Sequence, residues 1–361
     1  MNKNVKDRVV CIVMAVLLFG TALVCMFKPL DAYSFTERRS LKKFPQVSVN
    51  TILSGSFMTN FEDYTLDQFP LRDLFRGIKA VNELFVFQKT DNNKLYLADG
   101  HISKIEYPYH PDKITNAADK MNAVYERYLK DTGSKVYLSV IPDKNAFLAE
   151  KNGYLALDYA KLADCVAEKM DYAEYIEIAD LLDASDYYNT DTHWRQDKIV
   201  DVAERIAAAM DVDIKAEYKK EMLGQPFNGV YVGQAAIKVE PDTISYLTNN
   251  AIENVVLEGA QAVYDMDKAV GKDPYEMFLS GNQPVITIKN KENESGRRLV
   301  VFRDSFGSSI APLWMEGYSE IVLVDLRYIP SSMLGEYVDF TDADVLFLYS
   351  TMMLNNSKAM R

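Results

Sequence analysis

The sequence predicts an α/β fold in which helices flank a parallel sheet and a single transmembrane helix precedes it. Short apolar segments of strand type occur at 136–141, 299–302, 321–324 and 345–349. Nearly continuous apolar runs of this length are typical of strands that are buried on both faces of a parallel sheet. Near the N-terminus, an apolar segment without any charged residue runs from Val9 to Phe27.

The composition excludes several classes of protein. The chain has 361 residues, of which 48% are hydrophobic, and a formal net charge of −12. Such a chain can bury a sizeable core, and its acidity argues against a nucleic-acid partner. Of the three cysteines, only Cys165 lies outside the apolar segment. We therefore expect no disulfide within the body, no metal site and no cofactor.

The segment from Val9 to Phe27 has about the length that a helix needs to cross a bilayer. No cleavage motif of the A-x-A type follows it, which favours an uncleaved anchor over a cleaved signal peptide. Basic residues lie on both sides, so their count does not set the orientation, and a short cytoplasmic tail is the simpler topology. The expected parts are a tail (1–8), an anchor (9–27), a stalk (28–50) and an ectodomain (51–361), with 212–296 as a possible insertion or subdomain.

The body alternates between helical and extended patterns. Pro70–Phe87 is predicted as a helix with Pro70 at its first position. Asn92–Ile102 is predicted as a strand followed by a turn at Asp99-Gly100. Apolar residues at helical spacing predict two further helices, at 111–130 and 195–210.

The stretch YYNTDTHWRQD holds one of the three histidines, His193, two residues after Asp191. In extended backbone, residues two apart point to the same side, so the carboxylate can orient the imidazole as a general base. This reading requires 190–193 to be extended, with both side chains turned toward a nucleophile. The alternative is that Asp191 or Thr192 caps the following helix and His193 is a surface or packing residue.

The candidate nucleophile is Ser305, in the stretch RDSFG that follows the strand at 299–302. In open α/β sheets, ligands bind beyond the carboxyl ends of the strands. The amides that open the next helix would be placed to stabilise an oxyanion. The G-x-S-x-G pattern is absent, and a helix cap formed by Asp304 or Ser305 is the alternative.

Asp-Thr-His-Trp (191–194), followed by Asp-Ser-Phe-Gly (304–307), resembles the DHHW family, which is SGNH-hydrolase-like and related to the alginate O-acetyltransferases. Further stretches resemble the same family, and the resemblance covers most of residues 35–355; these stretches are 61–73, 140–149, 275–284 and 324–328. The fold that it implies is an SGNH-hydrolase-like sheet.

The resemblance implies a role for individual residues. Ser305 would be the nucleophile, His193 its general base and Asp191 the orienting carboxylate, in the reverse order to ordinary SGNH esterases. Candidates for binding substrate or the oxyanion are Arg327, Tyr328, Gly281 and Asn282. Pairing with Asp325 is the alternative for Arg327, and a plain turn is the alternative for Gly281 and Asn282. The second residue of the family motif is Thr192 here, and its side chain is expected to point away from the triad.

The implied activity is serine-dependent O-acetyl transfer onto a cell-surface or exported polysaccharide. A membrane-bound acyltransferase would supply the acetyl group, and the C-terminal domain of this single-pass membrane protein would work outside the cytoplasm. The acidity of the chain favours a neutral or amino-sugar polymer.

Three alternatives remain open on the sequence. The first is a carbohydrate acetyl esterase with the same triad. The second is a non-catalytic surface module that binds glycan or protein. The third is a metal site built from His193, Asp191 and Asp197.

Overall fold

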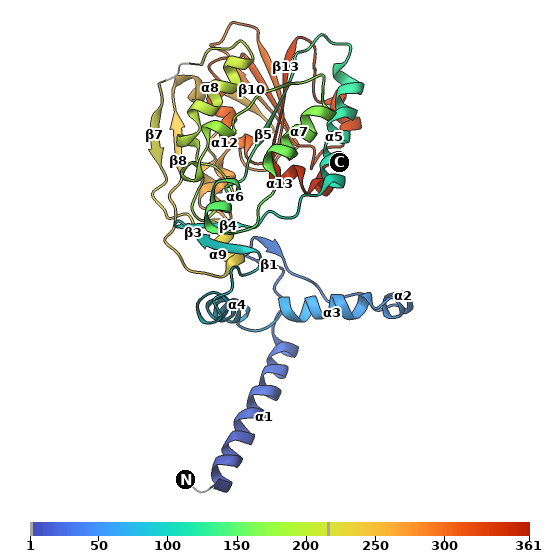
Figure 1. Cartoon of the computed structure of the whole chain (residues 1–361), viewed down its shortest axis with the longest axis vertical. Helices are drawn as coiled ribbons and strands as arrows, with labels where there is room; N and C mark the ends of the chain where they lie inside the picture. The colour runs from blue at the N-terminus through green and yellow to red at the C-terminus, as the bar shows by residue number, and fades with distance from the viewer. Residues whose placement is uncertain (1–2, 215–216) are drawn as a thin grey trace. The chain divides into compact units, whose positions relative to one another are not determined.

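The structure is a computed structural model that describes residues 3–214 and 217–361 (Figure 1). Two compact units emerge from the contacts between residues. The first unit comprises the described residues up to Asn93 together with Gly233–Lys238, and the second comprises the rest. The boundary at Asn93 differs from the boundary at residue 50 that the sequence suggested, because the helices after residue 50 pack within the first unit.

The first unit begins with helix α1 (Lys3–Phe27), of which Val5–Phe27 is long and apolar enough to cross a membrane. A two-stranded ribbon follows, formed by β1 (Tyr33–Ser34) and β2 (Arg39–Ser40). Helices α2 (Val49–Leu53), α3 (Ser56–Asp67) and α4 (Arg72–Val81) come next, and a π-helical turn, η1 (Asn82–Val86), continues α4. The helix therefore begins at Arg72, and Pro70 is not its first residue as the sequence suggested, because Leu71 has a left-handed backbone (φ 57°).

A seven-stranded sheet forms the centre of the second unit, in the order β6-β5-β13-β11-β12-β10-β9 (Figure 1). The strands are β5 (Val136–Ile141), β6 (Glu174–Tyr175), β9 (Val255–Glu258), β10 (Val285–Asn290), β11 (Arg298–Arg303), β12 (Glu320–Val324) and β13 (Ala343–Ser350). The pairs from β6 to β12 are parallel, whereas β10 pairs antiparallel with both β12 and β9. The four apolar segments that predicted a parallel sheet are thus its adjacent central strands.

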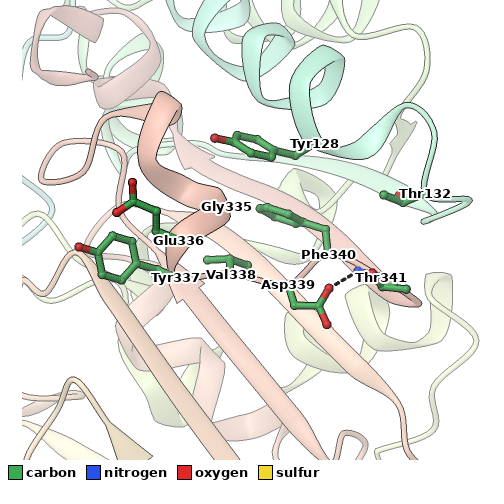
Figure 2. Close-up of a pocket in the computed structure, with 9 residues that line it drawn as sticks. All are labelled: Tyr128, Thr132, Gly335, Glu336, Tyr337, Val338, Asp339, Phe340 and Thr341. Atoms are coloured by element: carbon green, nitrogen blue, oxygen red, sulfur yellow. Dashed lines mark hydrogen bonds between the residues drawn. The ribbon is translucent and has the colours of Figure 1, made fainter.

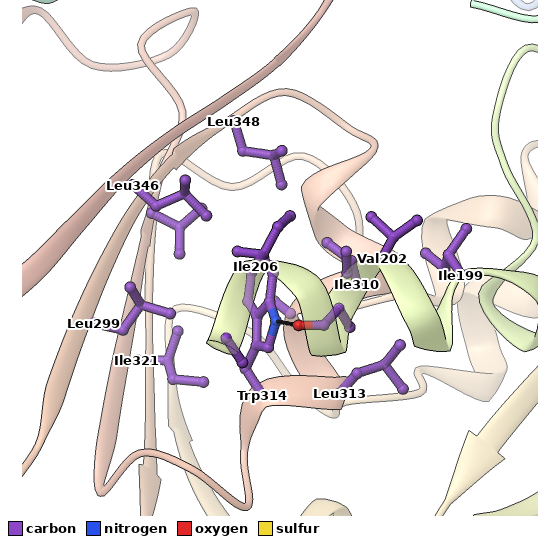
Figure 3. Packing of buried hydrophobic residues seen from close by; sticks show 14 of the residues in the cluster. Ile199, Val202, Ile206, Leu299, Ile310, Leu313, Trp314, Ile321, Leu346 and Leu348 are labelled. Atoms are coloured by element: carbon purple, nitrogen blue, oxygen red, sulfur yellow. Dashed lines mark hydrogen bonds between the residues drawn. The ribbon is translucent and has the colours of Figure 1, made fainter. Parts of the chain in front are cut away.

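Both faces of the sheet are buried, as the continuous apolar runs predicted. On one face, Leu299 and Val301 of β11 pack with α8 (Val200–Ala209) and Trp314. Figure 3 shows this packing, in which the Trp314 indole also donates a hydrogen bond of 3.0 Å to the Ala203 carbonyl. On the other face, Val300 and Phe302 pack with α5 (Pro111–Val124) and α7 (Tyr159–Lys169).

Two antiparallel hairpins complete the second unit. The first pairs β3 (Leu95–Ala98) with β4 (His101–Lys104) across the predicted turn, where Asp99 and Gly100 have φ values of 51° and 82°. The second pairs β7 (Lys219–Met222) with β8 (Ser245–Thr248). The remaining short helices are α6 (Asn145–Leu148), α9 (Val230–Ala235), α10 (Asn250–Glu253), α11 (Met266–Ala269), α12 (Gly307–Ile310) and α13 (Thr351–Leu354).

Residues 212–296, which the sequence set apart as a possible insertion, are divided among several parts of the fold. Within this range, β9 and β10 belong to the central sheet, and Gly233–Lys238 packs in the first unit. The described residues of this range therefore do not form a compact unit of their own. The sequence pattern of these strands alternates because β9 is the edge strand, with one exposed face, and β10 lies next to it, with one face only half-buried.

Candidate active site

The turn that carries Ser305 lies at the carboxyl end of β11. Asp304 fixes this turn, because its carboxylate accepts hydrogen bonds from the Phe306 amide (3.0 Å) and from the Ser350 amide and hydroxyl at the end of β13 (2.9 and 2.6 Å). Gly307 is required in this turn, since a Cβ atom there would lie 2.6 Å from the Arg303 Cβ. The turn thus holds the partly exposed Ser305 at the edge where open α/β sheets bind ligands.

His193 and Asp191 lie beside this turn. His193 Nε2 is 2.8 Å from Ser305 Oγ, across 112 residues of sequence, and His193 Nδ1 is 2.7 Å from Asp191 Oδ1. Both distances are those of hydrogen bonds. Asp191 is 1% exposed and the His193 side chain 11%, so water has little access to either group. Ser305, His193 and Asp191 therefore form a continuous hydrogen-bonded chain.

The backbone between Asn189 and His193 bends, and is not extended as the sequence reasoning required. A bridge between Tyr187 and Trp194 closes this loop. Asp191 Oδ1 accepts the backbone amide of His193 at 3.2 Å as well as the imidazole, which is the geometry of an Asx turn. The carboxylate and the ring therefore meet because the loop folds back on the Asp191 side chain, and not because two side chains of a strand share a face.

The second carboxylate oxygen of Asp191 also accepts a hydrogen bond. Its Oδ2 accepts the backbone amide of Val230 at 2.8 Å, while the neighbouring Gly229 amide donates to the Thr190 hydroxyl at 2.8 Å. A Cβ atom on Gly229 would lie 2.2 Å from the Thr190 carbonyl oxygen, so this close approach requires glycine. These donors fix the position of the carboxylate beside the imidazole ring.

The loop of His193 and the turn of Ser305 are joined by buried polar contacts. The Trp194 indole donates to the Phe306 carbonyl (3.2 Å) and to the Ser309 hydroxyl (2.9 Å), and the Gln196 amide donates to the Ser309 carbonyl (2.7 Å). All three distances join residues that follow the histidine to residues that follow the serine. The separation between His193 and Ser305 is therefore set by the surrounding structure and not by their own hydrogen bond alone.

Tyr275 covers the face of the imidazole. The two rings are stacked with centroids 3.8 Å apart and an interplanar angle of 9°. Burial raises the pKa of Tyr275 well above its ordinary value, so its hydroxyl stays protonated and donates to Ser309 Oγ at 2.8 Å. The ring limits the rotation of His193 and excludes water from one of its faces.

Arg327 and Tyr328, two of the predicted binding residues, contact neighbouring residues of the protein. Arg327 donates to Asp325, which is fully buried, at 2.9 Å from Nε and 2.6 Å from Nη2, and to Asn282 Oδ1 at 3.3 Å. The pairing of Arg327 with Asp325, which the sequence reasoning kept as the alternative, is thus present. The Arg327 guanidinium also lies over the Tyr328 ring at 5.4 Å, and Tyr328 is 44% exposed.

Gly281 and Asn282 belong to a tight turn. The Gly281 amide donates to the Phe278 carbonyl at 3.1 Å, and Leu279, Ser280 and Gly281 all have positive φ values of 52°, 56° and 83°. The Gly281 amide is therefore already engaged by the protein. In the turn after β11, the amides of Phe306, Gly307 and Ser308 also have acceptors, whereas within residues 3–214 and 217–361 the Ser305 amide has none.

Thr192 and Asp197, which the sequence reasoning weighed, point away from the triad. The Thr192 hydroxyl contacts the Met352 sulfur at 3.1 Å, in accord with the expectation that this side chain leaves the triad free. The Asp197 carboxylate pairs with Arg195 (3.2 Å) and Lys220 (2.6 Å). The metal alternative would need Asp197 to join His193 and Asp191, and these two cations occupy its carboxylate.

Lys144, Asp242 and Tyr275 also contribute to the site. Sequence reasoning assigned none of them a role there, although Lys144 and Tyr275 lie in two of the stretches that resemble the family (140–149 and 275–284). Lys144 donates to the carbonyls of Tyr188 and Asn189, and Asp242 accepts from the amides of Asn189 and Thr190. The position of Lys144 at the end of the buried strand β5 is a signal that the sequence carried. No sequence pattern marks Asp242, because it lies in an irregular segment and pairs with Phe227 only through an isolated bridge.

A separate hollow of about 500 Å³ lies among Tyr128, Thr132 and residues 335–341 (Figure 2). Residues 335–341 precede β13, whereas Ser305 follows β11, and these two strands are parallel. The hollow therefore lies at the amino edge of the sheet, and Ser305 lies at the opposite, carboxyl edge.

No family model matches the sequence, and no curated protein matches it either. Solved structures do match the fold. A DHHW family protein from Eubacterium siraeum aligns with 74% of this chain and 95% of its own, with a TM-score of 0.59 and 21% identity. Bacillus cereus PatB1, whose structure carries a sulfonyl adduct, aligns with 72% of this chain and 95% of its own, with a TM-score of 0.57 and 17% identity. This chain therefore has the fold of a DHHW family protein, as its sequence motifs predicted.

Proposed function

We propose that the protein is an O-acyltransferase that carries an acetyl group on Ser305 and passes it to a sugar hydroxyl. The observation that carries this proposal is the chain of hydrogen bonds from Ser305 Oγ through His193 (2.8 Å) to Asp191 (2.7 Å). A serine, a base and an orienting carboxylate in this geometry are the components of nucleophilic catalysis.

In the first half-reaction, Ser305 Oγ attacks the carbonyl carbon of an acetyl donor while His193 Nε2 takes the hydroxyl proton. Asp191 holds the Nδ1–H tautomer and stabilises the imidazolium. The tetrahedral intermediate collapses when the bond to the donor oxygen breaks, and His193 returns the proton to this leaving group. The acetyl group then remains on Ser305 as an ester.

In the second half-reaction, a sugar hydroxyl takes the place of the donor. His193 removes its proton, the sugar oxygen attacks the acetyl carbonyl, and Ser305 Oγ leaves and regains the proton. Water in place of the sugar would give hydrolysis by the same steps. The stacked Tyr275 ring and the low exposure of His193 support transfer, because they restrict water around the base.

The negative oxygen of both tetrahedral intermediates needs hydrogen-bond donors. We assign one of these to the Ser305 amide, which has no protein acceptor within the described residues. We retain the Asn282 side-chain amide as a second candidate and place Gly281 below it, because the Gly281 amide donates to Phe278. Arg327 would act by positioning Asn282, whose Oδ1 it contacts at 3.3 Å.

The proposed acceptor is a cell-surface or exported polysaccharide, and the proposed donor is a membrane-bound acyltransferase. Both rest on the family resemblance of the sequence and on helix α1, which could anchor the protein in the membrane in which such a donor resides. The part of the chain that follows α1 would then act on the extracytoplasmic side.

A sulfonyl fluoride tests the nucleophile directly, because an activated serine attacks sulfur and releases fluoride. Purified full-length protein is incubated with phenylmethylsulfonyl fluoride and analysed by intact mass and peptide mapping. We expect a single adduct on Ser305, and none in Ser305→Ala. The matched control is Ser308→Ala, which alters the next serine along the chain, in α12. Adduct formation that persists in Ser305→Ala would refute the assignment.

Acyl transfer is distinguished from hydrolysis by the fate of the acetyl group. With 4-nitrophenyl acetate as donor, nitrophenol release and acetylated sugar are measured with and without chitooligosaccharide or neutral glucan oligosaccharides. Transfer predicts acetylated oligosaccharide that depends on Ser305. Release of acetate alone, unchanged by every acceptor, would make the protein an esterase.

A further inference from the structure

Helix α4 and its continuation η1 turn their apolar side toward solvent. Large apolar residues along one side of this helix are exposed, from 48% at Ile78 to 68% at Leu71. Leu71 directly precedes α4, the α4 part carries Leu74, Phe75, Ile78 and Val81, and the η1 part carries Phe85 and Val86. Their spacing of three and four residues places them on one stripe of the helix.

The charged side of the same helix is the side that contacts the protein. Arg76 donates to the carbonyls of Gly233 (2.8 Å) and Gln234 (3.1 Å) and pairs with Glu37 (3.1 Å). Arg72 pairs with the same Glu37 at 2.5 Å. Ala80, on this side, is 1% exposed. The polarity of the helix is thus the reverse of that of an ordinary surface helix, which buries its apolar stripe.

An exposed apolar stripe of this size marks a surface that is covered in the working protein. The ion pairs of Glu37 and Asp67 keep the stripe exposed, because Arg39 and Arg72 bind both carboxylates and fix the polar side inward. Rotating the helix to bury its apolar side would remove these cations from buried carboxylates, which is costly. The outward orientation is therefore a stable property of this unit.

The position of α4 relative to the membrane-length helix indicates what covers the stripe. Lys28, the first residue after α1, lines a cavity of about 450 Å³ together with Leu71 and Leu74 at the start of α4. Asp31 reinforces this connection, since its amide and carbonyl both bond to the Gln68 side chain (2.9 Å each). The end of the apolar span and the start of α4 therefore line the same cavity.

We propose that the exposed side of α4–η1 lies in the interfacial region of the same lipid bilayer that α1 spans. A helix at this level would place its apolar side chains among the upper acyl chains and its charged side toward the protein. Basic residues follow the apolar span in the sequence and suit lipid phosphate groups; they are Lys28, Arg38, Lys42 and Lys43. This inference concerns the first unit alone and does not depend on the proposed function.

Depth-dependent quenching in proteoliposomes tests this proposal on the full chain. Cys11, Cys25 and Cys165 are first replaced by alanine, and single cysteines are then introduced as Phe75→Cys, Ile78→Cys or Phe85→Cys and labelled with an NBD fluorophore. Asp73→Cys is the matched control, because it is 54% exposed at its side chain but lies on the charged side of the same helix. Vesicles of phosphatidylcholine and phosphatidylglycerol are prepared with and without acyl-chain-brominated lipid.

We expect a blue-shifted emission and at least a two-fold quenching by brominated lipid at positions 75, 78 and 85, with little change at position 73. Equal emission at all four positions would place the stripe in water and overturn the proposal. A blue shift without quenching would also overturn it, because a protein and not lipid would then cover the stripe.

Discussion

Lys144 Nζ lies 2.8 Å from the carbonyl oxygen of Tyr188, at the base of the loop that carries Asp191 and His193. The same amine donates to the Asn189 carbonyl at 3.1 Å and is almost completely buried. On the other side of the loop, the Asp242 carboxylate accepts the amides of Asn189 (2.9 Å) and Thr190 (2.8 Å). A buried amine and a carboxylate therefore hold this loop between them.

Replacing this amine should displace Asp191 and His193 without removing either side chain. In Lys144→Met, the two carbonyls lose a buried donor, and we expect kcat to fall about 10-fold to 100-fold because small displacements of a base have effects of this size. KM should change little, since Lys144 is buried away from substrate. Steady-state kinetics with an acetyl ester measure both constants.

Lys151→Met is the control for this change, since Lys151 is 55% exposed at its side chain and pairs with Asp99 on the surface. Its kinetics should match those of the original protein. A Lys144→Met variant that folds with unchanged kcat would show that the loop does not need this amine.

Asp191 should be the most sensitive position after Ser305 and His193. Asparagine at this position keeps the shape but presents an NH₂ group to either the imidazole Nδ1–H or the Val230 amide, both of which are donors. We expect kcat for Asp191→Asn to fall about 10³-fold to 10⁴-fold, as for other triads whose imidazole adopts the wrong tautomer. An unchanged melting temperature would show that the loss is chemical, whereas activity within ten-fold of the original would exclude Asp191 from the triad.

His101 should make the second unit sensitive to acid. Burial lowers the pKa of its imidazole to about 4, with a further contribution from Lys144, while Asp242 and Asp99 act in the opposite direction. Above the ordinary pKa of about 6.5, the ring is neutral in both states and contributes nothing. As the pH falls from 6.5 toward 4, only the unfolded state binds the proton, so the free energy of unfolding decreases by up to about 3 kcal/mol.

This acid sensitivity is measured by urea denaturation at pH 7.5, 5.5 and 4.0. In His101→Gln, the side chain does not titrate, so the loss of stability between pH 6.5 and 4 should be about 3 kcal/mol smaller than in the original protein. Parallel pH profiles for the two proteins would show that His101 binds a proton equally well in both states.

The central strand β11 should tolerate truncation poorly. Leu299 is fully buried between β12 and β13, and Leu299→Ala should lower the free energy of unfolding by about 3 kcal/mol through lost contacts and a residual cavity. Leu155→Ala removes the same atoms from a residue that is 58% exposed, so it should change stability by less than about 0.5 kcal/mol. Chemical denaturation of both variants gives the comparison.

Sequence reasoning was most successful where a local pattern carries its own physical cause. The run Val136–Ile141 is a strand with the predicted bounds, because six successive apolar or small residues satisfy both faces of a buried strand. The Asp99-Gly100 turn also forms as predicted, since both residues accept a positive φ. The helix at 195–210 was less accurate, as a 3₁₀ turn (Gln196–Lys198) precedes α8.

The sequence by itself determined the local elements of this protein. These are an apolar segment of membrane length, four buried strands, and the motifs that contain Asp191, His193 and Ser305. Only the tertiary structure decided that His193 Nε2 and Ser305 Oγ lie 2.8 Å apart, and that a bent loop and not a strand brings Asp191 to the His193 ring. It also decided that α4 turns its charged side inward, where Glu37 binds Arg72 and Arg76. The physical reason is that periodicity tells which residues share a side of an element, whereas the partner of each side is set by contacts between residues far apart in the chain.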